Sequence, residues 1–169
     1  MTTKHIIAAA TLTAALTAGV ALAGTASPAL AAPAFGPQGY GGVTLGMSAK
    51  AAQATGKIVH KAGLDSPSCS GWDLKAHRTG RDTVGLFISK KQGVAIIFAP
   101  KGVRTPQGIG IGSTNAQLKR AYANKLRTAA SGFPYVAAPG NAKAHYYFLL
   151  RNGKIYEMGL ALDKQDCAN

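Results

Sequence analysis

The chain has 169 residues, and its 19 lysines and arginines outweigh six aspartates and glutamates to give a formal net charge of +13 at pH 7. This charge favours acidic partners through long-range attraction, but the basic residues occur in runs of no more than two, which excludes a polybasic nucleic-acid-binding tail. The few histidines and acidic residues are scattered, so no metal-ligand cluster is expected.

The N-terminus has the order of a secretory signal. Lys4 precedes an uncharged, weakly apolar run, and Ala29-Leu30-Ala31 supplies small residues at both determining positions of a cleavage site. We therefore predict that residues 1–31 are a signal peptide removed between Ala31 and Ala32, with residues 21–23 as the second choice, and that the mature protein is extracellular. No later apolar run is long enough to span a bilayer.

Residues 32–42 are rich in proline and glycine, and we expect them to form a flexible leader. A first repeat is predicted over residues 43–100. In it, Leu45-Gly46-Met47-Ser48 leads into an alanine-rich helix, because a hydroxyl side chain such as that of Ser48 caps a helix N-terminus. A short strand is expected at residues 72–74, followed by a hairpin of residues 83–89 and 94–99.

Residues 101–107 are interpreted as a linker, and residues 108–169 as a second repeat with the same order of helix, strand and hairpin. Gly112-Ser113-Thr114 precedes a predicted helix over residues 115–126, where Thr114 and Gln117 have the spacing of a capping box. The sequence thus predicts an α+β fold of two tandem repeats, with helices on one side of an antiparallel sheet.

The second hairpin is the strongest local signal in the chain. Asn152-Gly153 separates two apolar runs, and both residues tolerate the positive φ of a type I′ turn. A two-residue loop there predicts Tyr147 opposite Met158, with His145 and Tyr156 on the same face. The other face of this hairpin is apolar too, whereas a sheet covered on one side normally alternates apolar with polar residues. We therefore expect one face either to be covered by more of the protein or to bind a partner, and we favour the partner.

The two cysteines, Cys69 and Cys167, are expected to form one disulfide in an oxidising compartment. Closing a loop of roughly 100 residues contributes on the order of 4 kcal/mol in the chain-entropy model. Neither cysteine belongs to a C-x-x-C pair, so a structural metal site at these residues is not expected.

The exported two-repeat pattern resembles the beta-lactamase inhibitory protein family and a wider set of small secreted proteins of high-GC Gram-positive bacteria. The likeness covers residues 42–162 and is carried by residues 45–48 and 112–114, each of which opens a helix before strands. It implies that the sheets of the two repeats join into one concave surface that binds another protein through aromatic side chains. The residues that could take this role here are Trp72, His145, Tyr147, Tyr156 and Met158.

Two features depart from that family. Its members carry a disulfide inside each repeat, whereas Cys69 and Cys167 can only bridge the two halves. The family also has an acidic hairpin loop, whereas Lys90-Lys91-Gln92-Gly93 in the first half is basic. The resemblance therefore implies the architecture more strongly than it implies inhibition of a beta-lactamase.

Catalytic patterns are weak. Residues 108–114 are glycine-rich but lack the lysine of a phosphate-binding loop, so neither a nucleotide nor another cofactor is expected. No Gly-x-Ser-x-Gly segment occurs, and Asp73 with Asp82 or Glu157 is the only carboxylate pairing that we retain for hydrolysis. We expect a non-catalytic module that binds an extracellular protein. The alternatives are a basic protein that binds an anionic cell-wall polymer and, least favoured, a small secreted hydrolase.

Overall fold

The computed structural model describes residues 34–168, and the account below concerns that segment alone. The predicted signal peptide, residues 1–31, lies outside the described residues. None of the helices within residues 34–168 combines the length and the apolar character needed to cross a bilayer.

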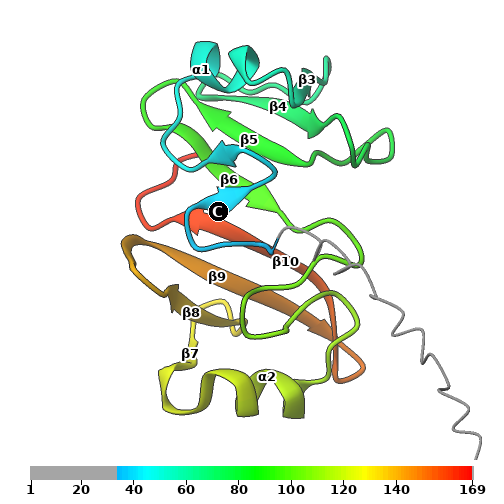
Figure 1. Cartoon of the computed structure of the whole chain (residues 1–169), viewed down its shortest axis with the longest axis vertical. Helices are drawn as coiled ribbons and strands as arrows, with labels where there is room; N and C mark the ends of the chain where they lie inside the picture. The colour runs from blue at the N-terminus through cyan, green and yellow to red at the C-terminus, as the bar shows by residue number, and fades with distance from the viewer. Residues whose placement is uncertain (1–33, 169) are drawn as a thin grey trace, which may run out of the picture. The chain divides into compact units, whose positions relative to one another are not determined.

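The described chain forms an antiparallel sheet of eight strands in the order β3-β4-β5-β6-β10-β9-β8-β7, as Figure 1 shows. This confirms the predicted antiparallel sheet. A separate two-stranded ladder pairs β1 (Gly39–Tyr40) with β2 (Val43–Thr44). The strands of the large sheet are β3 (Ile58–His60), β4 (Cys69–Leu74), β5 (Leu86–Ser89), β6 (Gly93–Phe98), β7 (Arg127–Thr128), β8 (Pro134–Ala138), β9 (Asn141–Arg151) and β10 (Lys154–Leu162).

Each half of the large sheet consists of four strands that are consecutive in the sequence. Helix α1 (Ala49–Ala54) precedes β3 to β6, and helix α2 (Asn115–Tyr122) precedes β7 to β10. The two halves meet where β6 pairs with β10, with Phe98 opposite Gly159. The centre of the sheet is therefore built from strands about 60 residues apart in the chain, a separation that makes such pairings slow to form during folding.

Both helices begin at the residues that the sequence predicts. The Ser48 side chain accepts a hydrogen bond from the Ala51 backbone N–H, and Thr114 and Gln117 form the complete capping box. Helix α2 ends before the expected Leu126, because Ala123 has a φ of 38° and the chain continues as a short 3-10 turn, Ala123–Lys125.

The main core lies on one face of the sheet. Alternate strand residues such as Leu86, Tyr146 and Phe148 point into it, and α1 contributes Ala52 while α2 contributes Leu118. Because both helices pack into the same cluster, this face is covered by the chain itself.

The expectation of a loose leader is wrong for the part that the structure describes. The Phe35 side chain is 0% exposed, and Tyr40 and Val43 join it in the core. The Phe35 backbone N–H donates to the Arg104 carbonyl at 2.8 Å, and the Tyr146 hydroxyl donates to the Phe35 carbonyl at 2.7 Å. Isolated apolar residues in glycine-rich sequence thus act as anchors that cover the middle of the sheet.

The register of the second hairpin also differs from the prediction. Asn152 and Gly153 have φ of 50° and 72°, as the expected turn requires. However, the pairing shifts between Ile155 and Glu157, which places Gly159, not Met158, opposite Tyr147. This β-bulge inserts one extra residue and moves every later side chain of β10 to the other face.

Two of the residues predicted to lie on the binding surface belong to the core instead. Met158 is 0% exposed and lies opposite Phe148, so it cannot contact a partner. Trp72 is 8% exposed and packs in the same cluster, with its Nε1–H donating to the Ser70 hydroxyl at 2.8 Å. The sequence around β4 contains no turn that would define the pairing of this strand, so it does not indicate which face of the sheet Trp72 occupies.

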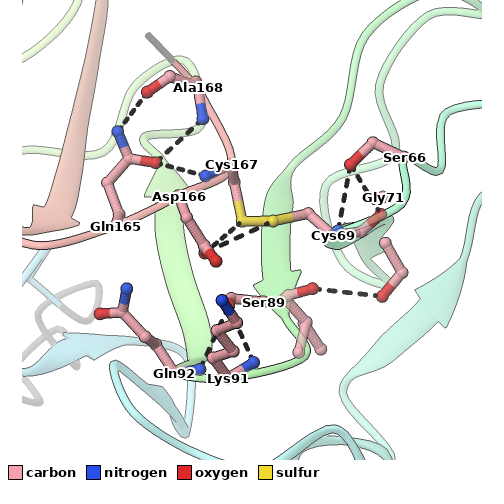
Figure 2. The surroundings of a disulfide bond; sticks show 12 residues. Ser66, Cys69, Gly71, Ser89, Lys91, Gln92, Gln165, Asp166, Cys167 and Ala168 are labelled. Carbon is pink, nitrogen blue, oxygen red and sulfur yellow. Dashed lines mark hydrogen bonds between the residues drawn. A yellow bond between two sulfur atoms is a disulfide. The ribbon is translucent and has the colours of Figure 1, made fainter.

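The predicted disulfide is confirmed. Cys69 at the start of β4 is bonded to Cys167, 98 positions later, with their Cα atoms 5.5 Å apart (Figure 2). The segment after β10 therefore crosses to β4, and Cys167 packs against a second, smaller cluster of buried residues, Ala95, Ile96 and Ala161.

We predict that replacing both cysteines by alanine lowers the free energy of unfolding by about 2–5 kcal/mol, because the unfolded chain regains the freedom that the long loop loses. Chemical denaturation of the wild type and of the Cys69→Ala/Cys167→Ala variant measures the difference. A thiol reductant should destabilise the wild type by a similar amount and leave the double variant unchanged. Equal stability of all samples would contradict the prediction.

Candidate binding site

The face of the sheet opposite the main core, termed here the open face, carries a hollow of about 780 Å³. Its volume lies within the range of small-molecule and peptide pockets. Side chains of β5, β6, β9 and β10 line it, together with residues of the flanking loops. Five aromatic side chains and one carboxylate belong to this lining: Phe87, Phe98, Phe133, Tyr147, Tyr156 and Glu157.

The aromatic rings of the hollow form a row across the sheet. The Tyr147 ring lies 6.4 Å from that of Phe98 and 6.1 Å from that of Phe133, and Phe98 lies 6.0 Å from Phe87. The interplanar angles of these three pairs are 87°, 63° and 68°, so each pair meets edge to face. This geometry is the one that the aromatic quadrupole favours.

Gly159 explains how Tyr147 joins this row. It pairs with Tyr147 on one side and with Phe98 on the other. A Cβ atom at position 159 would lie 2.6 Å from Cε1 and from the hydroxyl oxygen of Tyr147, so the ring occupies the space that any other side chain would fill. The contact of Tyr147 with Phe98, which belong to different halves of the sheet, therefore depends on a residue without a side chain.

Glu157 is the acidic partner of Tyr147. Burial raises the pKa of Tyr147, and the charge of Glu157 and its hydrogen bond with the phenol raise it further. The hydroxyl therefore stays protonated near neutral pH, with the Glu157 carboxylate beside it. A carboxylate has more acceptor positions than one donor occupies, so Glu157 retains capacity for a second donor from the hollow.

One wall of the hollow includes Asp82, Thr83 and Val84, in the loop that leads into β5. Asp73 on β4 holds this loop from beneath and is 4% exposed. Its carboxylate accepts hydrogen bonds from the Thr79 hydroxyl at 2.6 Å and the Gly85 N–H at 3.1 Å.

Lys61 completes the environment of Asp73. Its ammonium lies 3.3 Å from Asp73 Oδ2 and also donates to the Thr79 hydroxyl at 2.7 Å. Burial raises the pKa of Asp73, but the hydrogen bonds from Thr79 and the ammonium of Lys61 more than offset it, so the pKa lies below its ordinary value. Asp73 is therefore a charged group that holds the loop in place, whereas Asp82 and Glu157 lie in the lining of the hollow.

The opposite wall carries His145. Its Nδ1 lies 2.8 Å from Asp163 Oδ1, and its ring packs edge to face with Tyr135 at 5.7 Å. Tyr156, at the bulge, is 44% exposed, and the Arg151 guanidinium lies 4.6 Å from the centre of its ring. The bulge turns the Tyr156 side chain outward, and this explains its exposure.

Three of the five predicted surface residues, His145, Tyr147 and Tyr156, thus line the hollow, whereas Trp72 and Met158 do not. Sequence reasoning did not single out Phe87 or Phe98 as site residues, and it named Glu157 only as a candidate member of a carboxylate pair. Phe87 was recognisable, because it alternates with the core residues Leu86 and Ile88. Glu157 reaches the open face because the bulge, which no local pattern indicates, moves the residues after Ile155 to the opposite face.

A cluster near the disulfide resembles a metal site only superficially. Cys69, Asp166 and Cys167 bring ligand atoms within 4.8 Å of one another. Figure 2 shows, however, that the two sulfurs are bonded to each other. Asp166 Oδ1 lies 3.8 Å from the sulfur of Cys69 and 3.9 Å from that of Cys167. Sulfur that is shared in a disulfide offers no thiolate, which is the form that binds metal ions.

No protein-family model, curated protein or solved structure matches the chain.

We predict that Gly159→Ala displaces the Tyr147 ring and lowers the free energy of unfolding by about 1–3 kcal/mol, the usual cost of overpacking. The ring signals of Tyr147 in NMR spectra and a denaturation curve report both effects. Gly80→Ala is the matched control, because a Cβ there meets its nearest atom, the Thr83 hydroxyl, only at 3.8 Å. Unchanged Tyr147 signals in the Gly159 variant would contradict the role assigned to Gly159.

We predict that Asp73→Asn lowers the free energy of unfolding by about 1.5–3 kcal/mol at pH 7, because hydrogen bonds to a charged group are lost. A carboxyl whose pKa is lowered by folding stabilises the protein above its unfolded pKa, and this stabilisation disappears as the pH falls through the folded pKa. The gap between wild type and variant should therefore narrow below about pH 4. Urea denaturation at pH 7 and below about pH 4 measures this difference in unfolding free energy. Asp82→Asn, at an exposed position, is the control. A gap that is independent of pH would refute the assignment.

Proposed function

We propose that this protein is a secreted, non-catalytic module that binds another extracellular protein in the hollow of the open face. The observation that carries the proposal is the unequal cover of the two sheet faces. Residues of α1, α2 and the segment from Phe35 to Val43 pack on one face, whereas partly exposed aromatic side chains line a hollow on the other. Apolar surface that a chain leaves uncovered is typical of an interaction site.

The aromatic composition of the hollow supports protein recognition. Tyrosine and phenylalanine bury a large area and lose little conformational freedom when they bind, so they are frequent at the centres of interfaces. Tyr147 is already fixed by Gly159, Phe98 and Phe133. A ring that is immobile before binding adds affinity because less entropy is lost on association.

The duplicated architecture expected from the sequence belongs to the same proposal. A helix followed by four consecutive strands occurs twice, and the two groups of strands lie in mirror order about the β6–β10 pair. This order supports two tandem repeats that share one sheet, in keeping with the resemblance to the beta-lactamase inhibitory protein family. The disulfide between Cys69 and Cys167 supports an extracellular location, because such bonds persist in oxidising compartments.

Site-specific photo-crosslinking tests the proposal. We expect a benzophenone side chain in place of the exposed Tyr156 to cross-link one discrete secreted protein of the producing organism, because this position lies at the edge of the hollow. The same side chain in place of Lys119, an exposed residue of α2, should give no such product. Equal products from both positions, or none from either, would refute a partner site on the open face.

A further inference from the structure

The hollow differs in charge from the rest of the molecule. The chain has 19 lysines and arginines, yet none is among the described residues that line the hollow, whereas two of its six acidic residues, Asp82 and Glu157, are. A third acidic residue, Asp163, lies next to the lining residue His145, with its Oδ1 2.8 Å from the His145 Nδ1. At physiological ionic strength charges are screened over roughly 8 Å. The charged side chains of the lining itself are carboxylates, and one basic group, the Arg151 guanidinium, reaches the edge of the hollow at Tyr156.

The aromatic rings and Glu157 together match the requirements of a cation. A cation is attracted to the face of an aromatic ring, and a nearby carboxylate adds a charge-assisted hydrogen bond. Glu157 lines the same hollow as Tyr147 and Phe98, two members of the row of rings. The structure contains one example of this attraction at the same site, since Arg151 stacks on the ring of Tyr156.

We propose that the partner protein inserts an arginine side chain, flanked by apolar side chains, into the hollow, with its guanidinium beside Glu157. A guanidinium is planar, weakly hydrated and able to stack on rings, and these properties fit this lining better than those of an ammonium. The flanking apolar side chains cover Phe87 and Phe98, because a hollow of about 780 Å³ is larger than one side chain. This inference rests on the proposed function and adds the chemistry of the partner.

Three peptides of identical length test the inference by calorimetric titration of the full mature chain. They have the form acetyl-Leu-Phe-X-Leu-Phe-amide, where X is arginine, citrulline or glutamate. Citrulline matches arginine in shape but is uncharged. We expect the arginine peptide to bind about tenfold more tightly than the citrulline peptide, and the glutamate peptide to bind most weakly. Equal affinities of the arginine and citrulline peptides, or tighter binding of the glutamate peptide, would overturn the inference.

Variants of the protein locate the effect. Glu157→Gln should lower the affinity for the arginine peptide about tenfold and that for the citrulline peptide by a smaller factor, because citrulline loses no charge–charge attraction. Asp82→Asn, at an exposed position of the wall, should lower the affinity for the arginine peptide by a smaller factor. It serves as a second variant if the substitution at position 157 affects folding. Asp166→Asn removes the same charge outside the hollow lining and should change neither affinity.

The two proposals fail in different ways. If the benzophenone at position 156 captures a partner but the peptides do not discriminate by charge, the arginine inference is wrong and the binding function stands. If free methylguanidinium binds as tightly as the arginine peptide, the occupant is a small cation and the inference is equally wrong. Charge discrimination that is lost in Glu157→Gln, together with capture at position 156, supports both.

Discussion

The structure depends on a limit in the amount of chain available to cover the sheet. Helices of six and eight residues and a short N-terminal segment pack against eight strands, and their buried side chains all belong to one cluster. Burying apolar surface is the main driving force for folding, and these elements concentrate the buried apolar side chains on one face. The second face retains only a minor cluster of three buried residues, and around it the aromatic side chains stay partly accessible.

Local signals in the sequence predict much of the fold. The capping box of Thr114 and Gln117, the turn at Asn152-Gly153 and the pair of cysteines each specify a structure by their own chemistry, and the structure contains all three. The bulge after Ile155 was not predictable in this way. The bulge arises where the backbone of Ile155 makes hydrogen bonds with Ser113 and Gly112, which lie about 40 residues earlier in the chain.

The site shows the same division between local and distant determinants. Tyr147 and His145 alternate with core residues of one strand, and this alternation is visible in the sequence. The row that Tyr147 forms with Phe98 depends on the pairing of β6 with β10 across Gly159, and no short-range pattern indicates which strands become neighbours. The core position of Phe35 was missed for a related reason, since a lone aromatic residue has no periodicity.

The disulfide gives the two halves of the sheet a second covalent connection besides the backbone. Residues 101–107, between the two halves, lie inside the loop that Cys69 and Cys167 close. A single proteolytic cut in this segment therefore leaves one connected molecule, in which the hydrogen bonds between β6 and β10 continue to hold the halves together. In a medium that contains proteases, a cut in this segment therefore does not separate the strands that line the two sides of the hollow into different molecules.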